Sequence, residues 1–206
     1  MPSVLVANPK GGCGKTTLAT NLAGFFANKG AEVTLCDLDR QQSSLRWLAF
    51  RQEGLPPVAG FYGGNQMMVT PPTGKEWMVI DAPAGLQGYK LNDTVRRVDK
   101  VVVPLVPSLF DMAATEDFLL ALRKDMIGRR NSIGIVAMRV DPRTRAAVML
   151  QEFLSHFDLP IIGYLRNTQN YVNVAAAGAT IFDPPKGKSK KDVQQWETLL
   201  EWVESR

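Results

Sequence analysis

Apolar residues recur along the chain in two alternating kinds of pattern. Short, nearly continuous apolar runs bounded by Gly, Pro, Asp or Asn predict strands that are covered on both faces. They lie at residues 3–7, 32–36, 77–80, 100–106, 132–138 and 159–164. Between them, apolar residues at three- and four-residue spacing predict helices. These helices cover residues 15–28, 43–51, 112–127, 146–156, 171–177 and 191–204.

The alternation of strands and helices is typical of βα units and predicts an α/β fold. We expect a single-domain P-loop fold over residues 1–206, with a twisted, mostly parallel sheet and helices on both faces. Residues 54–75 are rich in proline and glycine and are predicted to be irregular. The apolar side chains of residues 191–204 fall on one face, which predicts a terminal helix docked on the core.

Composition agrees with a soluble, cytoplasmic domain. Of 206 residues, 45% are hydrophobic, and no apolar run approaches the roughly 20 residues of a membrane-spanning helix. Cys13 and Cys36 have no partner at a metal-ligand spacing, so we expect buried or incidental thiols. His156 is the only histidine and is predicted to lie at the surface, which leaves histidine catalysis unsupported.

The strongest motif connects the first predicted strand to the first predicted helix. Its sequence is Lys10-Gly11-Gly12-Cys13-Gly14-Lys15-Thr16-Thr17, here called the phosphate loop. Glycines let the backbone turn tightly and aim N–H groups into a concavity, and the helix N-terminus adds partial positive charge. We therefore predict ATP or ADP binding, with Lys15 on the β- and γ-phosphates and Thr16 on Mg²⁺.

Three aspartates follow the next strands. Asp37 and Asp39 end the second strand, where alternation predicts that they share a side and that a cation or ordered water separates them. Asp81 ends the apolar run 77–80, the pattern in which an acid holds Mg²⁺ through a water. We predict metal contacts for Thr16, Asp37 and Asp81.

The phosphate loop resembles the deviant Walker A motif of the ParA/MinD family. Pro9 stands where the general P-loop has glycine, the motif begins with an additional lysine, and Asn8-Pro9 looks like the small plasmid-partition ParA proteins. The resemblance implies that Lys10 reaches across an ATP-bound homodimer to the partner's nucleotide. It also implies that Asp39 places the hydrolytic water, although Arg40 replaces the proline usual in the family. Lys10, Lys15 and Asp39 are the expected catalytic residues.

Later segments are similar to the same family. Residues 103–111 resemble the strand end that lines the dimer interface, which implies interface positions at Pro107 and Asp111. Residues 136–139 resemble the strand that ends beside the adenine, which implies that Arg139 contacts nucleotide. Residues 170–181 resemble the family's terminal segment. A plain core role explains each of these segments nearly as well.

The charge favours a polyanionic partner. The net charge is +4 and the pI is about 9.1. Basic residues in the second half of the chain are candidates for contacts with the phosphates of nonspecific double-stranded DNA. They are Arg143, Arg145, Arg166, Lys186, Lys188, Lys190 and Lys191.

We therefore expect a ParA-like, nucleoid-associated ATPase that segregates or positions a large cargo. A ParB-like or other adaptor would stimulate its hydrolysis. Two alternatives stay open. A MinD-like membrane-cycling ATPase is disfavoured because Glu197, Glu201 and Glu204 on the terminal helix would be repelled by anionic lipid. A metabolic P-loop enzyme is the other.

Overall fold

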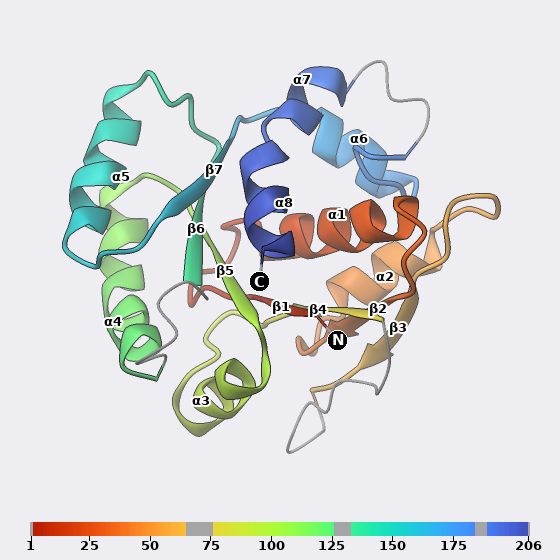
Figure 1. The fold of residues 1–206 in the computed structure, drawn as a ribbon, viewed down its shortest axis with the longest axis horizontal. Helices are drawn as coiled ribbons and strands as arrows, with labels where there is room; N and C mark the ends of the chain where they lie inside the picture. The colour runs from red at the N-terminus through yellow and green to blue at the C-terminus, as the bar shows by residue number, and fades with distance from the viewer. Residues whose placement is uncertain (1, 65–75, 126–132, 184–188, 206) are drawn as a thin grey trace.

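A computed structural model describes residues 2–64, 76–125, 133–183 and 189–205. Seven strands form one sheet in the order β3-β2-β4-β1-β5-β6-β7, and every neighbouring pair is parallel, which confirms the predicted α/β class (Figure 1). The strands are β1 (Ser3–Val6), β2 (Val33–Asp37), β3 (Ala59–Tyr62), β4 (Trp77–Asp81), β5 (Lys100–Leu105), β6 (Ile133–Met138) and β7 (Ile161–Leu165).

Helices cover both faces of the sheet. On one side lie α1 (Lys15–Asn28), α2 (Ser43–Ala49), α6 (Asn170–Ala176), α7 (Lys190–Gln194) and α8 (Glu197–Glu204) (Figure 1). On the other lie α3 (Gly88–Arg97), α4 (Leu109–Asp125) and α5 (Arg145–Ser155). In the described residues, no helix is long and apolar enough to cross a membrane.

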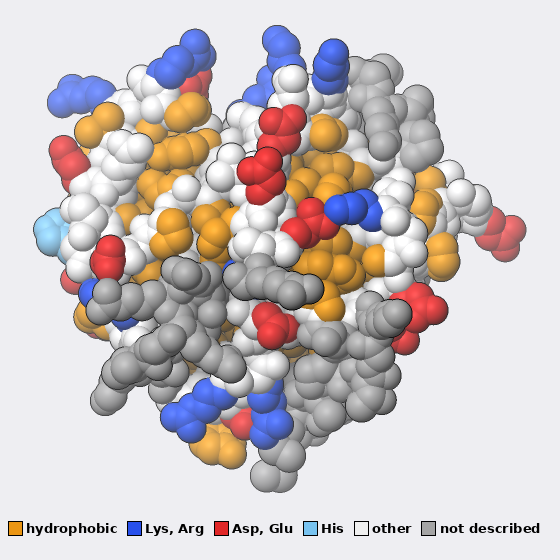
Figure 2. All heavy atoms as spheres, viewed as in Figure 1, with side chains coloured by type: hydrophobic (Ala, Val, Ile, Leu, Met, Phe, Trp, Pro, Cys, Tyr) orange, Lys and Arg blue, Asp and Glu red, His pale blue; other side chains and the backbone are white. Residues whose placement is uncertain are grey.

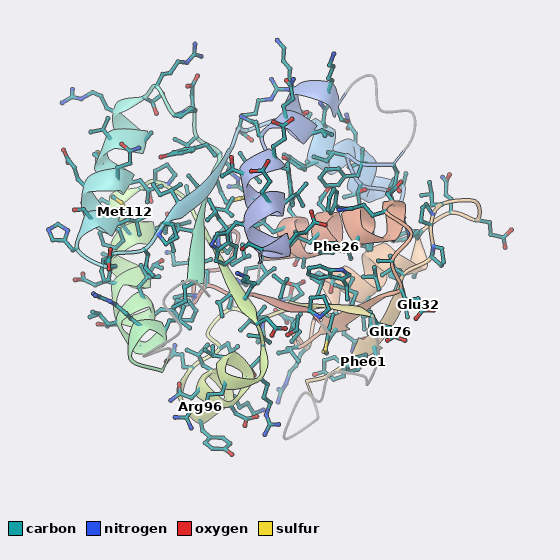
Figure 3. The ribbon with its side chains drawn as sticks, viewed as in Figure 1. Phe26, Glu32, Phe61, Glu76, Arg96 and Met112 are labelled. Carbon is teal, nitrogen blue, oxygen red and sulfur yellow. The ribbon has the colours of Figure 1, made fainter. Side chains whose placement is uncertain are left out.

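Strand alternation divides the core into two apolar layers. In β1, Val4 and Val6 pack with α1, whereas Leu5 packs in the layer with α3, α4 and α5. On the α1 side, Phe26 faces the sheet and its ring stacks on Trp77 at a centroid distance of 3.7 Å (Figure 3). Both layers cover β1, so the strand before the phosphate loop is held on two faces.

The order of the strands reverses at β1. The chain leaves β1 for β2, β3 and β4 on one side and then places β5, β6 and β7 on the other. In such sheets, ligands bind outside the carboxyl ends of the strands at the point of reversal. The phosphate loop follows β1 at that point.

Three elements differ from the sequence-based expectation. The segment 54–75, predicted to be irregular, contains the edge strand β3, which pairs with β2. The helix α3 was not predicted, since only Leu91, Thr94 and Val95 of its ten residues are buried. The predicted terminal helix is two helices, α7 and α8, which are separated at residues 195 and 196. Its docking is confirmed, because Trp196 and Leu199 are fully buried.

A buried ion pair fastens the segment after α6 to the helices beside the phosphate loop. Arg51 donates to both carboxylate oxygens of Asp183 at 3.1 Å, and the two side chains are 5% and 1% exposed. Asn28 donates to the same carboxylate at 2.7 Å. Gly178 has φ of +62°, and a Cβ there would lie 2.2 Å from the Arg51 backbone nitrogen, so glycine permits the close approach.

Burial alone would raise the pKa of Asp183, but the hydrogen bonds from Arg51 and its neighbours outweigh burial and lower the pKa. Ionised Asp183 therefore stabilises the fold at pH values above its unfolded pKa of about 4. This contribution is lost as the pH falls through the lower pKa of the folded protein.

We predict that Asp183→Asn lowers the free energy of unfolding by about 3 kcal/mol at pH 7, because it leaves the Arg51 guanidinium buried without its counter-charge. The difference from wild type should narrow below about pH 4. Urea denaturation at both pH values measures it. Glu204→Gln is the matched control, because Glu204 pairs with Lys29 at the surface and should cost less than about 1 kcal/mol. Equal losses in the two variants would contradict the prediction.

Candidate nucleotide-binding site

The phosphate loop has the backbone shape that its glycines predict. Gly12 and Gly14 have φ values of +74° and +104°. The φ of Gly14 favours glycine, and a Cβ there would lie 2.6 Å from Met138 Cε, so the end of β6 packs closely against the loop. The loop leads directly into α1, whose 14 residues begin at Lys15 without a side-chain cap. The first N–H groups of α1 are therefore placed for an anion.

The ammonium group of Lys15 lies inside the loop. Lys15 is 8% exposed, and its Nζ donates to the carbonyl of Lys10 at 2.6 Å. Nζ also lies 3.8 Å from Cys13 Sγ. Burial raises the pKa of the Cys13 thiol, which donates to the same carbonyl at 3.3 Å. The expectation of buried thiols is confirmed for Cys13 and Cys36, both of which are free.

Thr16 and Asp81 meet at the start of α1. The Thr16 hydroxyl donates to Asp81 Oδ2 at 2.8 Å. Burial raises the pKa of Asp81 to about 7, the Thr16 hydrogen bond opposes this, and neighbouring Asp37 adds to it. The second oxygen, Oδ1, is buried and has no hydrogen-bond partner among the described residues. A hydroxyl beside a carboxylate with an unpaired oxygen is a donor set suited to a hard cation.

The described residues contain no group of three or more His, Cys, Asp or Glu side chains placed to hold a metal by themselves. Magnesium is usually bound by one or two carboxylates together with waters and substrate phosphates. The Thr16–Asp81 pair fits a cation that arrives with a polyphosphate better than it fits an all-protein metal site.

Asp37 is held by hydrogen bonds within the chain, and its contact with a metal stays a prediction. It is fully buried beside Asp81 in the register of β2 and β4. Its Oδ2 accepts from the Ser44 backbone at 3.0 Å and the Ser44 hydroxyl at 2.7 Å. Its Oδ1 accepts from the Asp39 backbone at 2.9 Å. Asp37 thus holds the first turn of α2 and the chain that leads to it.

The strand alternation assumed for Asp39 does not apply, because β2 ends at Asp37. Asp39 lies in the following turn, half-buried, and its Oδ1 accepts from the Gln41 backbone at 2.9 Å. The backbone N–H groups next to each carboxylate, rather than strand geometry, determine how these two acids are placed.

The residues predicted at the nucleotide and interface edges lie near the carboxyl ends of β5 and β6. Arg139, with φ of +58°, donates to the carbonyl of Gly12 at 3.1 Å, which brings it against the phosphate loop. Pro107 and Asp111 are half-buried around the start of α4. The Ser108 hydroxyl donates to the Asp111 carboxylate and so caps that turn.

The candidate DNA-contact residues differ in their exposure and in whether they form ion pairs within the chain. Arg166 donates from Nε to the buried carboxylate of Asp192 at 2.6 Å and so anchors α7. Arg143 is 86% exposed and pairs with Asp141, whose pKa its hydrogen bonds lower to about 2. Arg145, Lys190 and Lys191 are exposed. Lys186 and Lys188 lie outside the described residues. Figure 2 shows Lys and Arg side chains above the start of α5 and above α7, with a second group near α3.

Sequence reasoning missed two residues that brace this site. Ser44 is buried and bonds Asp37, seven residues before it. Asn8 is buried next to the phosphate loop and bonds the backbone of Lys10. Each precedes or follows a recognisable motif, but a helix-start serine and an asparagine after a strand are too common to be selected from sequence alone.

Comparison with known proteins identifies the family of this chain. The family model of the CobQ/CobB/MinD/ParA nucleotide binding domain matches residues 4–181. Maintenance of carboxysome distribution protein A of Halothiobacillus neapolitanus is 24% identical in an alignment of 198 residues that covers 92% of this chain and 91% of that protein. The chromosome-partitioning ATPase Soj of Thermus thermophilus is 30% identical in an alignment of 190 residues that covers 75% of this chain and 76% of that protein.

A solved structure shows the same fold. The septum site-determining protein MinD from Pyrococcus horikoshii, complexed with Mg-ADP, is similar with a TM-score of 0.72 and 16% identity. The similarity covers 99% of this chain and 96% of that one. Since the family model spans the sheet from β1 to β7 together with the phosphate loop and Asp81, the chain belongs to the CobQ/CobB/MinD/ParA family of nucleotide-binding domains.

Proposed function

We propose that this protein is a ParA-like ATPase that dimerises with ATP, binds DNA without sequence preference and positions a large cargo. The observation that carries the proposal is the juxtaposition of the Lys15 ammonium, the Thr16 hydroxyl and the unpaired Asp81 oxygen around one glycine-rich turn. A polyphosphate with its cation satisfies all three groups at once.

In the proposed nucleotide complex, the Lys15 ammonium leaves the Lys10 carbonyl and binds the β- and γ-phosphates. Thr16 and Asp81 would hold Mg²⁺, which would supply positive charge to the phosphates. Asp37 supports this arrangement from the last position of β2. Asp39 lies in the turn that follows and positions the attacking water.

Among the described residues, few Lys and Arg side chains lie around the phosphate loop. Lys15 serves the bound nucleotide, and Arg139 is bonded to a loop carbonyl. Lys10 is half-buried at the outer start of the loop. In a homodimer joined at this face through Pro107 and Asp111, Lys10 stabilises the charge that develops on the partner's transferred phosphoryl group.

The relatives support a positioning role. One is named for carboxysome distribution and another for chromosome partitioning. Both names concern the placement of a large assembly, so we propose that a ParB-like or other cargo adaptor stimulates hydrolysis and that the ATP-bound dimer is nucleoid-associated in the cytoplasm. The α8 helix buries Leu199 and Val203 against the core, which argues against the membrane-binding alternative.

We predict that Lys15→Ala loses ATP binding, because the phosphate-facing ammonium is removed, whereas Asp39→Ala binds ATP and hydrolyses it at least about tenfold more slowly. Asp39→Ala should then accumulate as a dimer. Fluorescent-ATP titration, phosphate release and size-exclusion chromatography with ATP and Mg²⁺ measure the three properties. An Asp39→Ala protein that stays monomeric with saturating ATP would overturn the proposed switch.

We predict that Asp81→Asn reduces the gain in ATP affinity that Mg²⁺ produces by about tenfold or more. The reason is that an amide cannot supply the charge that holds the cation. ATP titrations with Mg²⁺ and with EDTA measure that gain directly. Glu201→Gln, at an exposed carboxylate on α8, is the control and should change neither value. An unchanged Mg²⁺ dependence in Asp81→Asn would remove this residue from the site.

We predict that DNA binding requires ATP, since the dimer pairs the basic surfaces of two subunits and multiplies their phosphate contacts. Lys190→Ala/Lys191→Ala should weaken binding to unrelated duplexes and reduce the salt slope by about 1 for each DNA phosphate that is no longer neutralised. Lys29→Ala/Lys90→Ala removes the same charge from other helices and should leave binding unchanged. Mobility shifts with ADP or ATP at two salt concentrations measure both pairs. Equal binding with ADP would reject the proposal.

A further inference from the structure

Asn8 is a buried polar residue that braces the phosphate loop but is not among the groups proposed above to bind phosphate or metal. It follows β1, two residues before Lys10, and is 2% exposed. Its Oδ1 accepts from the Lys10 backbone N–H at 2.8 Å. Its Nδ2 donates to the Pro104 carbonyl at 2.8 Å and to the Thr115 hydroxyl oxygen at 3.3 Å. One side chain therefore joins the phosphate loop to the end of β5 and to α4.

These partners specify an asparagine. A backbone N–H can only donate and a carbonyl can only accept, so the position needs an acceptor and a donor on one short side chain. Aspartate would place a carboxylate oxygen against the Pro104 carbonyl oxygen. Leucine of similar size would leave both backbone groups unpaired in a buried place.

Hydrogen bonds hold the peptide groups on both sides of Lys10. Asn8 accepts from the Lys10 N–H, and the Lys10 carbonyl accepts from the Cys13 thiol and from Lys15 Nζ. Only the Lys15 bond is lost in the proposed nucleotide complex, so the Asn8 bond to Lys10 remains. The Lys10 N–H consequently faces Asn8 and not the concavity of the phosphate loop. Asn8 determines where the Lys10 side chain starts without being one of the groups that bind phosphate.

The contact at the other end leads to the first turn of α4. Thr115 is 0% exposed, and its hydroxyl donates to the Asp111 carbonyl at 2.6 Å. The same turn carries Leu109 and Phe110, whose side chains are mostly exposed. A continuous set of hydrogen bonds thus runs from Lys10 through Asn8 and Thr115 to the turn that contains Asp111.

We infer that Asn8 is a positioning residue that aims Lys10 and couples it to the first turn of α4. This inference rests on the proposed function, in which Lys10 acts on the nucleotide of a partner subunit. Asn8 acts through the Lys10 backbone and touches no reacting atom. Its loss should therefore impair dimerisation and hydrolysis more than it impairs nucleotide binding.

The test is Asn8→Ala, compared with wild type for fluorescent-ATP affinity, ATP-dependent dimerisation and phosphate release. We expect the dissociation constant of ATP to change by less than about threefold and that of the dimer to rise by about tenfold or more. Losses of equal size in both constants would show a purely structural role and overturn the inference. A normal dimer would overturn it as well.

Two threonine variants keep the inference testable if Asn8→Ala does not fold. Thr115→Val keeps the Asn8 bonds to Lys10 and Pro104 and removes only the α4 end of the connection. Thr94→Val removes the same kind of bond on α3, where the hydroxyl donates to the Lys90 carbonyl at 2.7 Å. We expect Thr115→Val to weaken the dimer by about two- to fivefold and Thr94→Val to have no effect. If Asn8→Ala does not fold, equal effects of the two valine variants would overturn the inference.

A double-mutant cycle with Lys10→Ala identifies the residue through which Asn8 acts. If Asn8 works by aiming Lys10, then adding Asn8→Ala to Lys10→Ala should cost no further dimer affinity. Additive losses would overturn the inference while leaving the proposed function standing. A wild-type protein that stays monomeric with ATP would instead overturn the proposed function, and phosphate release by the same variants would then decide the role of Asn8.

Discussion

Parallel pairing of β1 with β4 and β5 is the constraint on which the site depends. Because parallel strands end at the same edge of a sheet, the phosphate loop, Asp81 and the Pro104 carbonyl meet there although they are far apart in sequence. The two apolar layers hold β1 so firmly that the glycine turn after it can keep its N–H groups available. Reversal of the strand order at β1 then opens this edge to a ligand.

The buried acid at that edge, Asp81, differs in its hydrogen bonding from the buried acid Asp183. Asp183 is surrounded by donors and paired with Arg51, so its charge is satisfied within the fold. Asp81 has one unpaired oxygen and a second carboxylate nearby. The fold satisfies the hydrogen-bonding capacity of Asp183 and leaves one oxygen of Asp81 unpaired. The unpaired oxygen lies at the edge of the sheet where a cation with phosphate can enter.

The sequence was most informative where local pattern and chemistry coincide. The strands buried on both faces, the phosphate loop and Asp81 could be predicted, since continuous apolar runs and a glycine-rich turn carry their own physical reasons. The strand β3 could not, because its short Ala-Gly-Phe-Tyr run is a strand only by pairing with the edge of β2. The helix α3 shows too few apolar positions. The contacts of Asp37 and Asn8 depend on backbone groups from other elements, which no spacing in the sequence reveals.

Residues that come late in the sequence cover part of α1, and this affects how the chain folds while it is being synthesised. The helix that follows the phosphate loop shares its apolar layer with Ile181, Phe182, Trp196 and Leu199, which come much later in the sequence. Its polar residue Asn21 accepts from the Ile181 backbone at 3.1 Å. The nascent α1 therefore lacks part of its apolar cover until the segments that carry these residues have been synthesised. In that interval, its uncovered apolar side chains are a surface that a chaperone would meet.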